Sequence, residues 1–185
     1  RDKFGQSPLW IAAKNGHDAV VKLLLKAKAK VQRFRDFSDT PLNIAAANGH
    51  ATVVKLLLEA KANVERVSFY MSRTPLWIMS EKGHATVIKV LLEAKANVKQ
   101  LDWDRQTPLQ IAARNGHGAV VKLLLEAKAD VESRDRPGRT PLLSAAKNGH
   151  DAVVKLLLEA KADVESREVS GRTPLLSAAE NGHDA

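Results

Sequence analysis

Proline and glycine recur along this chain at nearly constant intervals, and that spacing limits what the sequence can fold into. Six prolines, each preceded by Ser or Thr and followed by Leu, stand 33 or 34 residues apart: Pro8, Pro41, Pro75, Pro108, Pro141 and Pro174. Six glycines, each followed by His, keep the same interval: Gly16, Gly49, Gly83, Gly116, Gly149 and Gly182. This period is typical of a stack of small structural units.

Each unit reads as a pair of short helices. In one unit, Thr140 is a favourable N-cap residue, and Pro141 suits the first helical turn. Apolar residues then recur at helical spacing until an Asn-Gly pair ends the helix, because Gly adopts the left-handed conformation without steric cost. The segment 151–160, DAVVKLLLEA, predicts a second, more apolar helix that runs antiparallel to the first. Two such helices cannot bury their apolar faces alone, so each unit must stack on its neighbours.

The pattern TPL..AA..GH...V..LL...A.V resembles the ankyrin repeat, and it covers the whole chain. The resemblance implies an all-α solenoid of helix-turn-helix units joined by β-hairpin-like loops, called fingers below. It also implies that fingers and first helices line a concave, protein-binding face. We expect a single ankyrin-repeat domain over residues 1–185, with units at about 1–32, 33–65, 66–99, 100–132, 133–165 and an incomplete 166–185.

Two positions depart from the family pattern. The family's His after TPL, which usually makes hydrogen bonds between repeats, is replaced by Trp10, Asn43, Trp77, Gln110, Leu143 and Leu176. The family's Gly after the second helix is replaced by Lys28, Lys61, Lys95, Lys128 and Lys161. We therefore expect five lysines in the left-handed conformation, at a cost of about 1 kcal/mol each.

These lysines favour a natural framework, because a designer would place Gly at such helix ends. The repeat sequence GRTPLL.AA.NGH.AVVKLLLEAKADVES resembles the self-similar ankyrin arrays of fungal NOD-like receptors. An engineered binder built on such a framework is the alternative interpretation.

Variation between units is concentrated in the fingers. Residues 115–134 and 148–167 differ only at Gly118 and Asp151, whereas the finger sequences change throughout. Six of the eight aromatic residues lie in fingers, and the other two, Trp10 and Trp77, follow TPL on what we expect to be the polar side of the first helix. Aromatic side chains gathered on a surface are typical of binding hot spots. The alternative is that the finger aromatics are structural spacers that pack on the next finger.

The sequence therefore predicts a non-catalytic module that binds a folded protein through units one to four. The predicted contact residues are Trp10, Phe34, Arg35, Asp36, Phe37, Phe69, Tyr70, Met71, Trp77, Glu81, Leu101, Asp102, Trp103, Asp104 and Arg114. Four of them are expected to form a charged rim that orients the partner: Arg35, Asp36, Asp102 and Asp104.

The histidines are the residues that could suggest an enzyme or a metal site. One follows each glycine, so neighbouring histidines should lie about 10 Å apart, which is too far for joint zinc ligation. A structural hydrogen bond between helices is the favoured role. No catalytic motif stands outside the repeat pattern, and we expect neither enzymatic activity nor a cofactor or metal.

The net charge of +8 makes nucleic acid or another polyanion an alternative partner. Most second-helix lysines, however, have an acidic residue four positions later, which is typical of a solvated face. Steep loss of binding with salt would favour the alternative.

No apolar run approaches the roughly 20 residues of a membrane span, and the chain has no cysteine. We expect a cytoplasmic protein without a membrane anchor. Self-association through apolar ends of the stack is a further alternative.

Overall fold

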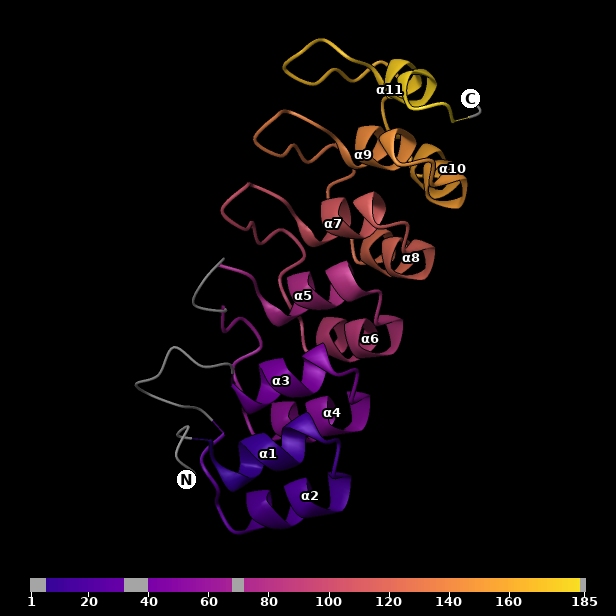
Figure 1. Cartoon of the computed structure of the whole chain (residues 1–185). Coiled ribbons are helices and arrows are strands. Elements are labelled where there is room, and N and C mark those ends of the chain that lie inside the picture. Colours follow the sequence, from indigo (N-terminus) through magenta and orange to yellow (C-terminus); the bar gives the residue numbers. More distant parts are fainter. Residues whose placement is uncertain (1–5, 32–39, 68–71, 184–185) are drawn as a thin grey trace. The chain divides into compact units, whose positions relative to one another are not determined.

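The computed structural model describes residues 6–31, 40–67 and 72–183, and within these ranges the regular structure consists of eleven helices (Figure 1). The first helices of the units are α1 (Pro8–Lys14), α3 (Pro41–Ala47), α5 (Pro75–Lys82), α7 (Pro108–Arg114), α9 (Pro141–Lys147) and α11 (Pro174–Glu180). The second helices are α2 (Asp18–Lys26), α4 (Ala51–Glu59), α6 (Ala85–Glu93), α8 (Gly118–Glu126) and α10 (Asp151–Glu159). None of these helices is long and apolar enough to cross a membrane.

The first helices begin as the sequence predicts. The side-chain oxygen of Thr107 accepts a hydrogen bond from the backbone N–H of Gln110 at 3.2 Å, and Pro108 occupies the first turn. Ser7 and Thr40 cap α1 and α3 in the same way. This cap satisfies one of the backbone donors that a helix leaves unpaired at its start.

The second helices end at lysines with left-handed backbone, which confirms the prediction for that position. The φ angles lie between 59° and 66°, at Lys28, Lys61, Lys95, Lys128 and Lys161. In each described example the chain turns sharply; the N–H of Lys128 donates to the carbonyl of Leu125 at 3.0 Å.

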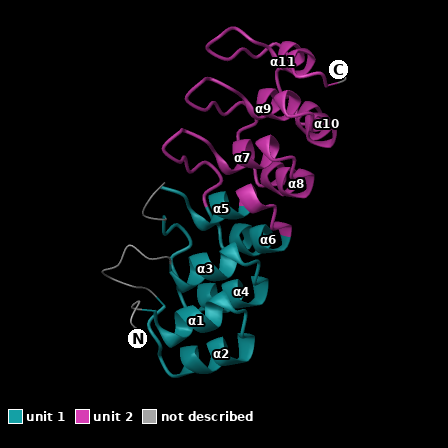
Figure 2. Ribbon diagram, in the orientation of Figure 1, with its two compact units in different colours: residues 1–79, 86–96 teal, residues 80–85, 97–185 magenta. Residues whose placement is uncertain are grey.

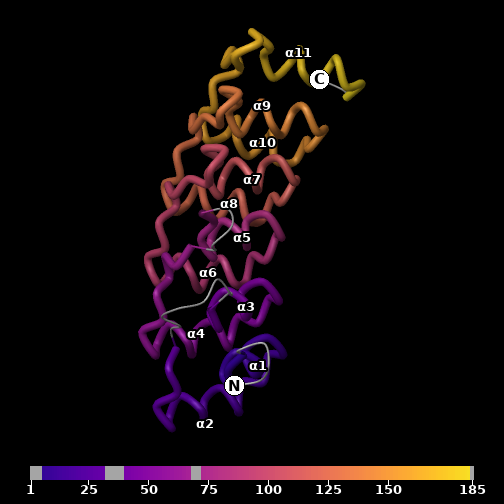
Figure 3. Tube along the Cα trace, turned by 60° about the vertical axis from the view of Figure 1, so that its left-hand side comes forward, coloured from indigo at the N-terminus to yellow at the C-terminus, as the bar shows by residue number. Residues whose placement is uncertain are grey.

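The chain divides into two compact units, residues 1–79 with 86–96 and residues 80–85 with 97–185 (Figure 2). In the first unit α1 packs against α3 and α2 against α4. In the second unit α7, α9 and α11 follow one another, and α8 packs against α10 (Figures 1 and 3). First helices thus pack on first helices and second helices on second helices. One continuous domain over residues 1–185 stays a prediction.

The core of each unit is mainly aliphatic, and the first unit adds Trp10, Trp77 and Met79 to it. In the second unit Leu109, Ile111, Val121 and Leu124 have no exposed surface, and in the first unit Leu57 is equally buried. Burial of a large aliphatic side chain contributes about 1.5–3 kcal/mol, so stacking supplies most of the stability of such short helices.

The fingers in the described part of the chain are loops, although their closure resembles that of a hairpin. In the finger before α7 the N–H of Asp102 donates to the carbonyl of Gln106 at 3.2 Å. The next finger repeats this bond from Asp135 to Arg139 at 3.2 Å. Each loop therefore has a defined turn at its base.

Candidate functional site

Three fingers of the second unit, called the finger row below, comprise residues 101–106, 134–139 and 167–172. Backbone hydrogen bonds join adjacent loops: the N–H of Arg136 donates to the carbonyl of Asp104 at 3.0 Å, and the N–H of Val169 donates to that of Pro137 at 2.9 Å. The loops project on the same side of α7, α9 and α11 (Figure 1). Because each loop is held by its neighbour, the row presents a preorganised edge.

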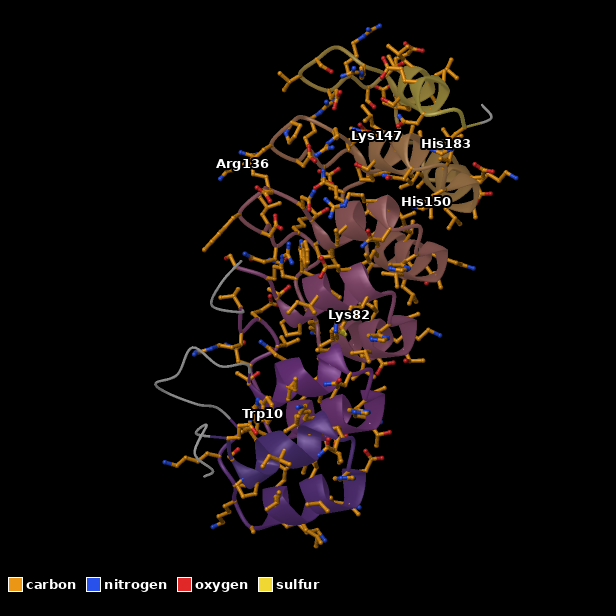
Figure 4. The ribbon with its side chains drawn as sticks, viewed as in Figure 1. Trp10, Lys82, Arg136, Lys147, His150 and His183 are labelled. Carbon is orange, nitrogen blue, oxygen red and sulfur yellow. The ribbon has the colours of Figure 1, made fainter. Side chains whose placement is uncertain are left out.

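Arginine side chains strengthen these connections. The Nε of Arg136 donates to the carbonyl of Trp103 in the preceding finger at 2.8 Å. An Nη of Arg134 donates both within its own loop, to Gly138 at 3.0 Å, and to Arg167 of the next finger at 2.8 Å. Figure 4 shows Arg136 at the tip of its loop, away from the helices. Sequence reasoning did not anticipate this bridging role, since it connects residues about one repeat apart.

Trp103 is a strongly exposed predicted contact residue of the row. Its side chain is 59% exposed, and its neighbours Leu101 and Asp104 are exposed as well. An exposed tryptophan on a hydrogen-bonded loop has the surface and rigidity of a binding anchor.

Asp102 does not lie on an exposed rim, contrary to the prediction. It is 7% exposed, and its Oδ1 accepts hydrogen bonds from the backbone N–H groups of Asp104 and Gln106 at 3.0 and 2.9 Å. Asp135, the equivalent residue of the next finger, accepts from the N–H of Arg139 at 2.8 Å. The carboxylate therefore shapes the turn, and the recurrence of an acidic residue at this finger position was the signal in the sequence.

Trp10 and Trp77 are buried, so the expectation that they face solvent is wrong. Their exposed fractions are 8% and 1%. The guanidinium of Arg73 stacks 3.7 Å from the Trp77 ring centroid, and Nζ of Lys14 lies 5.5 Å from that of Trp10. The helical spacing correctly placed Trp10 beside Lys14, but the lysine reaches back over the ring while the ring itself packs inward.

At Asn43 and Gln110 the position after TPL is buried beneath the base of a loop, whereas Leu176 at the same position is 47% exposed. In the first unit the side-chain amide of Asn43 donates to the carbonyl of Arg66 at 3.3 Å. In the second unit the amide of Gln110 donates to Ser133 and Arg139 at 3.0 and 2.9 Å. These two residues keep hydrogen bonds to the loop that follows, although the family's histidine is absent.

Three of the histidines, His50, His117 and His150, join successive repeats, which confirms the predicted structural role at these positions. The Nε2 of His50 lies 3.0 Å from the carbonyl oxygen of Lys14, and a carbonyl oxygen only accepts, so the imidazole donates. His117 donates in the same way to Glu81 at 2.9 Å, and His150 to Arg114 at 3.0 Å. The backbone carbonyls of Glu81 and Arg114 thus accept hydrogen bonds that join repeats, while their side chains are half-buried.

Several predicted contact residues lie outside the described residues: Phe34, Arg35, Asp36, Phe37, Phe69, Tyr70 and Met71. Among the described residues no three His, Asp or Glu side chains come together as a metal site would require.

A family model of ankyrin repeats in three copies matches residues 1–68, 65–135 and 129–185. The chain therefore belongs to the ankyrin repeat family. Ankyrin repeats are generally protein–protein interaction modules, and proteins built from them are typically non-catalytic scaffolds. A comparison with curated proteins gives no match to this chain.

Proposed function

We propose that this chain is a non-catalytic recognition module that binds a folded protein partner through its finger tips and first-helix residues. The observation that carries the proposal is the finger row: three loops linked by backbone hydrogen bonds, with Trp103 exposed on them.

The hydrogen bonds between the loops favour binding, because the loops lose conformational entropy when the chain folds and not when the partner docks. Association is opposed by the loss of loop and side-chain freedom, about 0.5–1.5 kcal/mol for each immobilised long side chain. Loops whose main chains already bond to one another lose less of that freedom on docking.

The contrast among the three tryptophans supports the same surface. Trp10 and Trp77 are buried and stabilise the stack, whereas Trp103 leaves most of its ring in contact with solvent. Arg114 on α7 and Glu81 on α5 are further proposed contact residues, and the finger aromatics of the second and third repeats stay contact residues predicted from the sequence.

Site-specific photo-crosslinking tests this proposal. A benzophenone amino acid replaces Trp103 in one version of the full chain and Lys155, which is exposed on α10, in the control. Both versions are irradiated in the same cell extract after circular dichroism shows equal helix content. We expect a discrete crosslinked protein from position 103 that unlabelled chain competes away. Crosslinking at Lys155 alone would contradict the proposal, because it would place the partner on the second helices.

A further inference from the structure

The finger row contains four exposed arginines without an acidic partner: Arg105, Arg134, Arg136 and Arg167. In the described part of the chain, no carboxylate lies within ion-pair distance of them. The remaining two arginines of the row differ in this respect. Arg139 pairs with Asp135 at 3.0 Å, and Arg172 pairs with Glu180 at 2.7 Å.

Hydrogen bonds to main-chain carbonyls hold three of the four guanidinium groups, those of Arg134, Arg136 and Arg167. Arg136 uses only its Nε for the hydrogen bond to Trp103, so both terminal nitrogens are available to a ligand. Arg167 donates from one terminal nitrogen to the carbonyl of Gly171 at 3.1 Å. An arginine held by a carbonyl keeps its full charge, and a carboxylate that approaches it forms short, charge-assisted hydrogen bonds.

Apolar surface lies between these charges. Val169 is 84% exposed at the tip of the last finger, Trp103 is 59% exposed in the first, and Pro137 is exposed between them. A shallow hollow between the last two loops is lined by Arg136, Pro137, Val169 and Arg172, together with Ser170 and Glu168, whose carboxylate pairs with Arg172 at 3.6 Å. The row thus offers cationic and apolar groups in alternation.

We propose that the finger row binds an acidic segment of a partner protein in which apolar side chains stand between the carboxylates. This inference rests on the proposed protein-recognition function and names the chemistry of the partner. Carboxylates would pair with Arg105, Arg136 and Arg167, while aliphatic or aromatic side chains cover Trp103 and Val169.

The row fits such a segment better than it fits nucleic acid. A phosphate backbone is uniformly negative and would meet the exposed carboxylate of Asp104. It would also leave Val169 and Pro137 without an apolar partner. A polypeptide can place an apolar or basic residue opposite Asp104 and a carboxylate opposite Arg136.

Tryptophan fluorescence of the full chain provides the assay. Because Trp10 and Trp77 are buried, emission that iodide quenches comes from Trp103. The probe is a synthetic peptide that alternates acidic and aliphatic residues. The comparison probes are its Asn/Gln counterpart, a counterpart with Ser at the aliphatic positions, and single-stranded DNA of similar length. We expect the first peptide to bind most tightly and to protect Trp103 from iodide.

The variant Arg136→Gln with Arg167→Gln should weaken binding of the acidic–aliphatic peptide at least about tenfold, as expected when charge-assisted pairs are lost. The control, Lys122→Gln with Lys155→Gln, removes equal charge from exposed positions on α8 and α10 and should change the dissociation constant less than about twofold. Unchanged quenching of Trp103 by acrylamide, a neutral quencher that does not respond to the lost arginine charges, shows in the absence of peptide that the row is intact. Arg105→Gln is a second test, because its side chain makes no hydrogen bond to the described residues.

Equal losses in the two double variants would overturn the inference, as would tighter binding of the neutral peptide. Tighter binding of DNA, abolished by the finger variant, would replace the acidic segment with a polyanion. The proposed function has a separate test: a protein crosslinked at position 103 that binds the Arg136→Gln, Arg167→Gln variant normally would support protein recognition and refute the acidic partner.

Discussion

Gly116 satisfies two requirements at once. Its φ angle is 75°, in the left-handed region that favours glycine, and a Cβ atom at this position would lie 2.7 Å from Nδ1 of His150. The imidazole packs on the glycine while its Nε2 donates to Arg114. Gly116 and His150 therefore form one contact between two successive repeats, in which the glycine leaves the space that the histidine of the next repeat occupies.

We predict that Gly116→Ala destabilises the second unit by about 2 kcal/mol or more, from backbone strain plus displacement of the His150 ring. Gly182→Ala is the matched control, because Gly182 has a φ of 70° but nothing within 4 Å of the added Cβ. Its cost should be about 1 kcal/mol, from strain alone. Urea unfolding measures both; equal costs would show that the contact with histidine does not matter.

We predict a smaller loss of stability when a histidine that donates this hydrogen bond is replaced by alanine. His117→Ala leaves the carbonyl of Glu81 without its imidazole partner, although Asn115 still donates to that oxygen at 3.1 Å. We expect a loss of about 1 kcal/mol in the free energy of unfolding. At His150 no second donor to the Arg114 carbonyl is seen among the described residues, so His150→Ala should cost more. The reverse order would contradict this hydrogen-bond assignment.

At the scale of the element, the backbone strain of a second helix lies at its C-terminal end. The helix α8 stops where Lys128 adopts a φ of 64°, a conformation in which a side chain is strained. The lysine stays exposed, so its position is determined by the backbone turn and not by a packed side chain.

We predict that Lys128→Gly raises the free energy of unfolding by about 0.5–1 kcal/mol, because relief of strain exceeds the added flexibility of the unfolded chain. The same substitution inside the helix, Lys122→Gly, should lower it by about 1 kcal/mol. Thermal melts compare the two variants with the parent chain. If both lower the melting temperature, the left-handed cap is not a source of strain.

At the scale of the whole molecule, stability comes from contacts between adjacent repeats. Within the second unit, α9 packs on α7 and α11, and α8 packs on α10. Because residues 115–134 and 148–167 are nearly identical, the surface that one repeat offers to the next is nearly the same along this part of the chain.

Deletion of residues 118–150 should therefore leave a folded, shorter stack, since it removes one period and rejoins equivalent positions. We expect unchanged helix content per residue and a urea m-value reduced roughly in proportion to chain length. The control removes residues 118–133 alone, which does not rejoin equivalent positions, and it should abolish cooperative unfolding. A folded control would contradict repeat-by-repeat stacking.

The sequence by itself determined the repeats, the helix pairs, the left-handed lysines and the structural role of the histidines. These features depend on local signals, such as a Thr-Pro start and a Gly end, that recur once per unit. Their repetition turned a weak local preference into a reliable prediction.

Only the tertiary structure decided which side chains face solvent. Trp10 and Trp77 are buried, Asp102 is turned into its own loop, and Gln110 bonds to Ser133 and Arg139. The hydrogen-bond partners of Gln110 lie 23 and 29 residues away in the sequence, so the periodicity of its own helix does not predict them. The physical reason is that exposure in a stack depends on the loop that covers a position, and that loop belongs to another part of the repeat array.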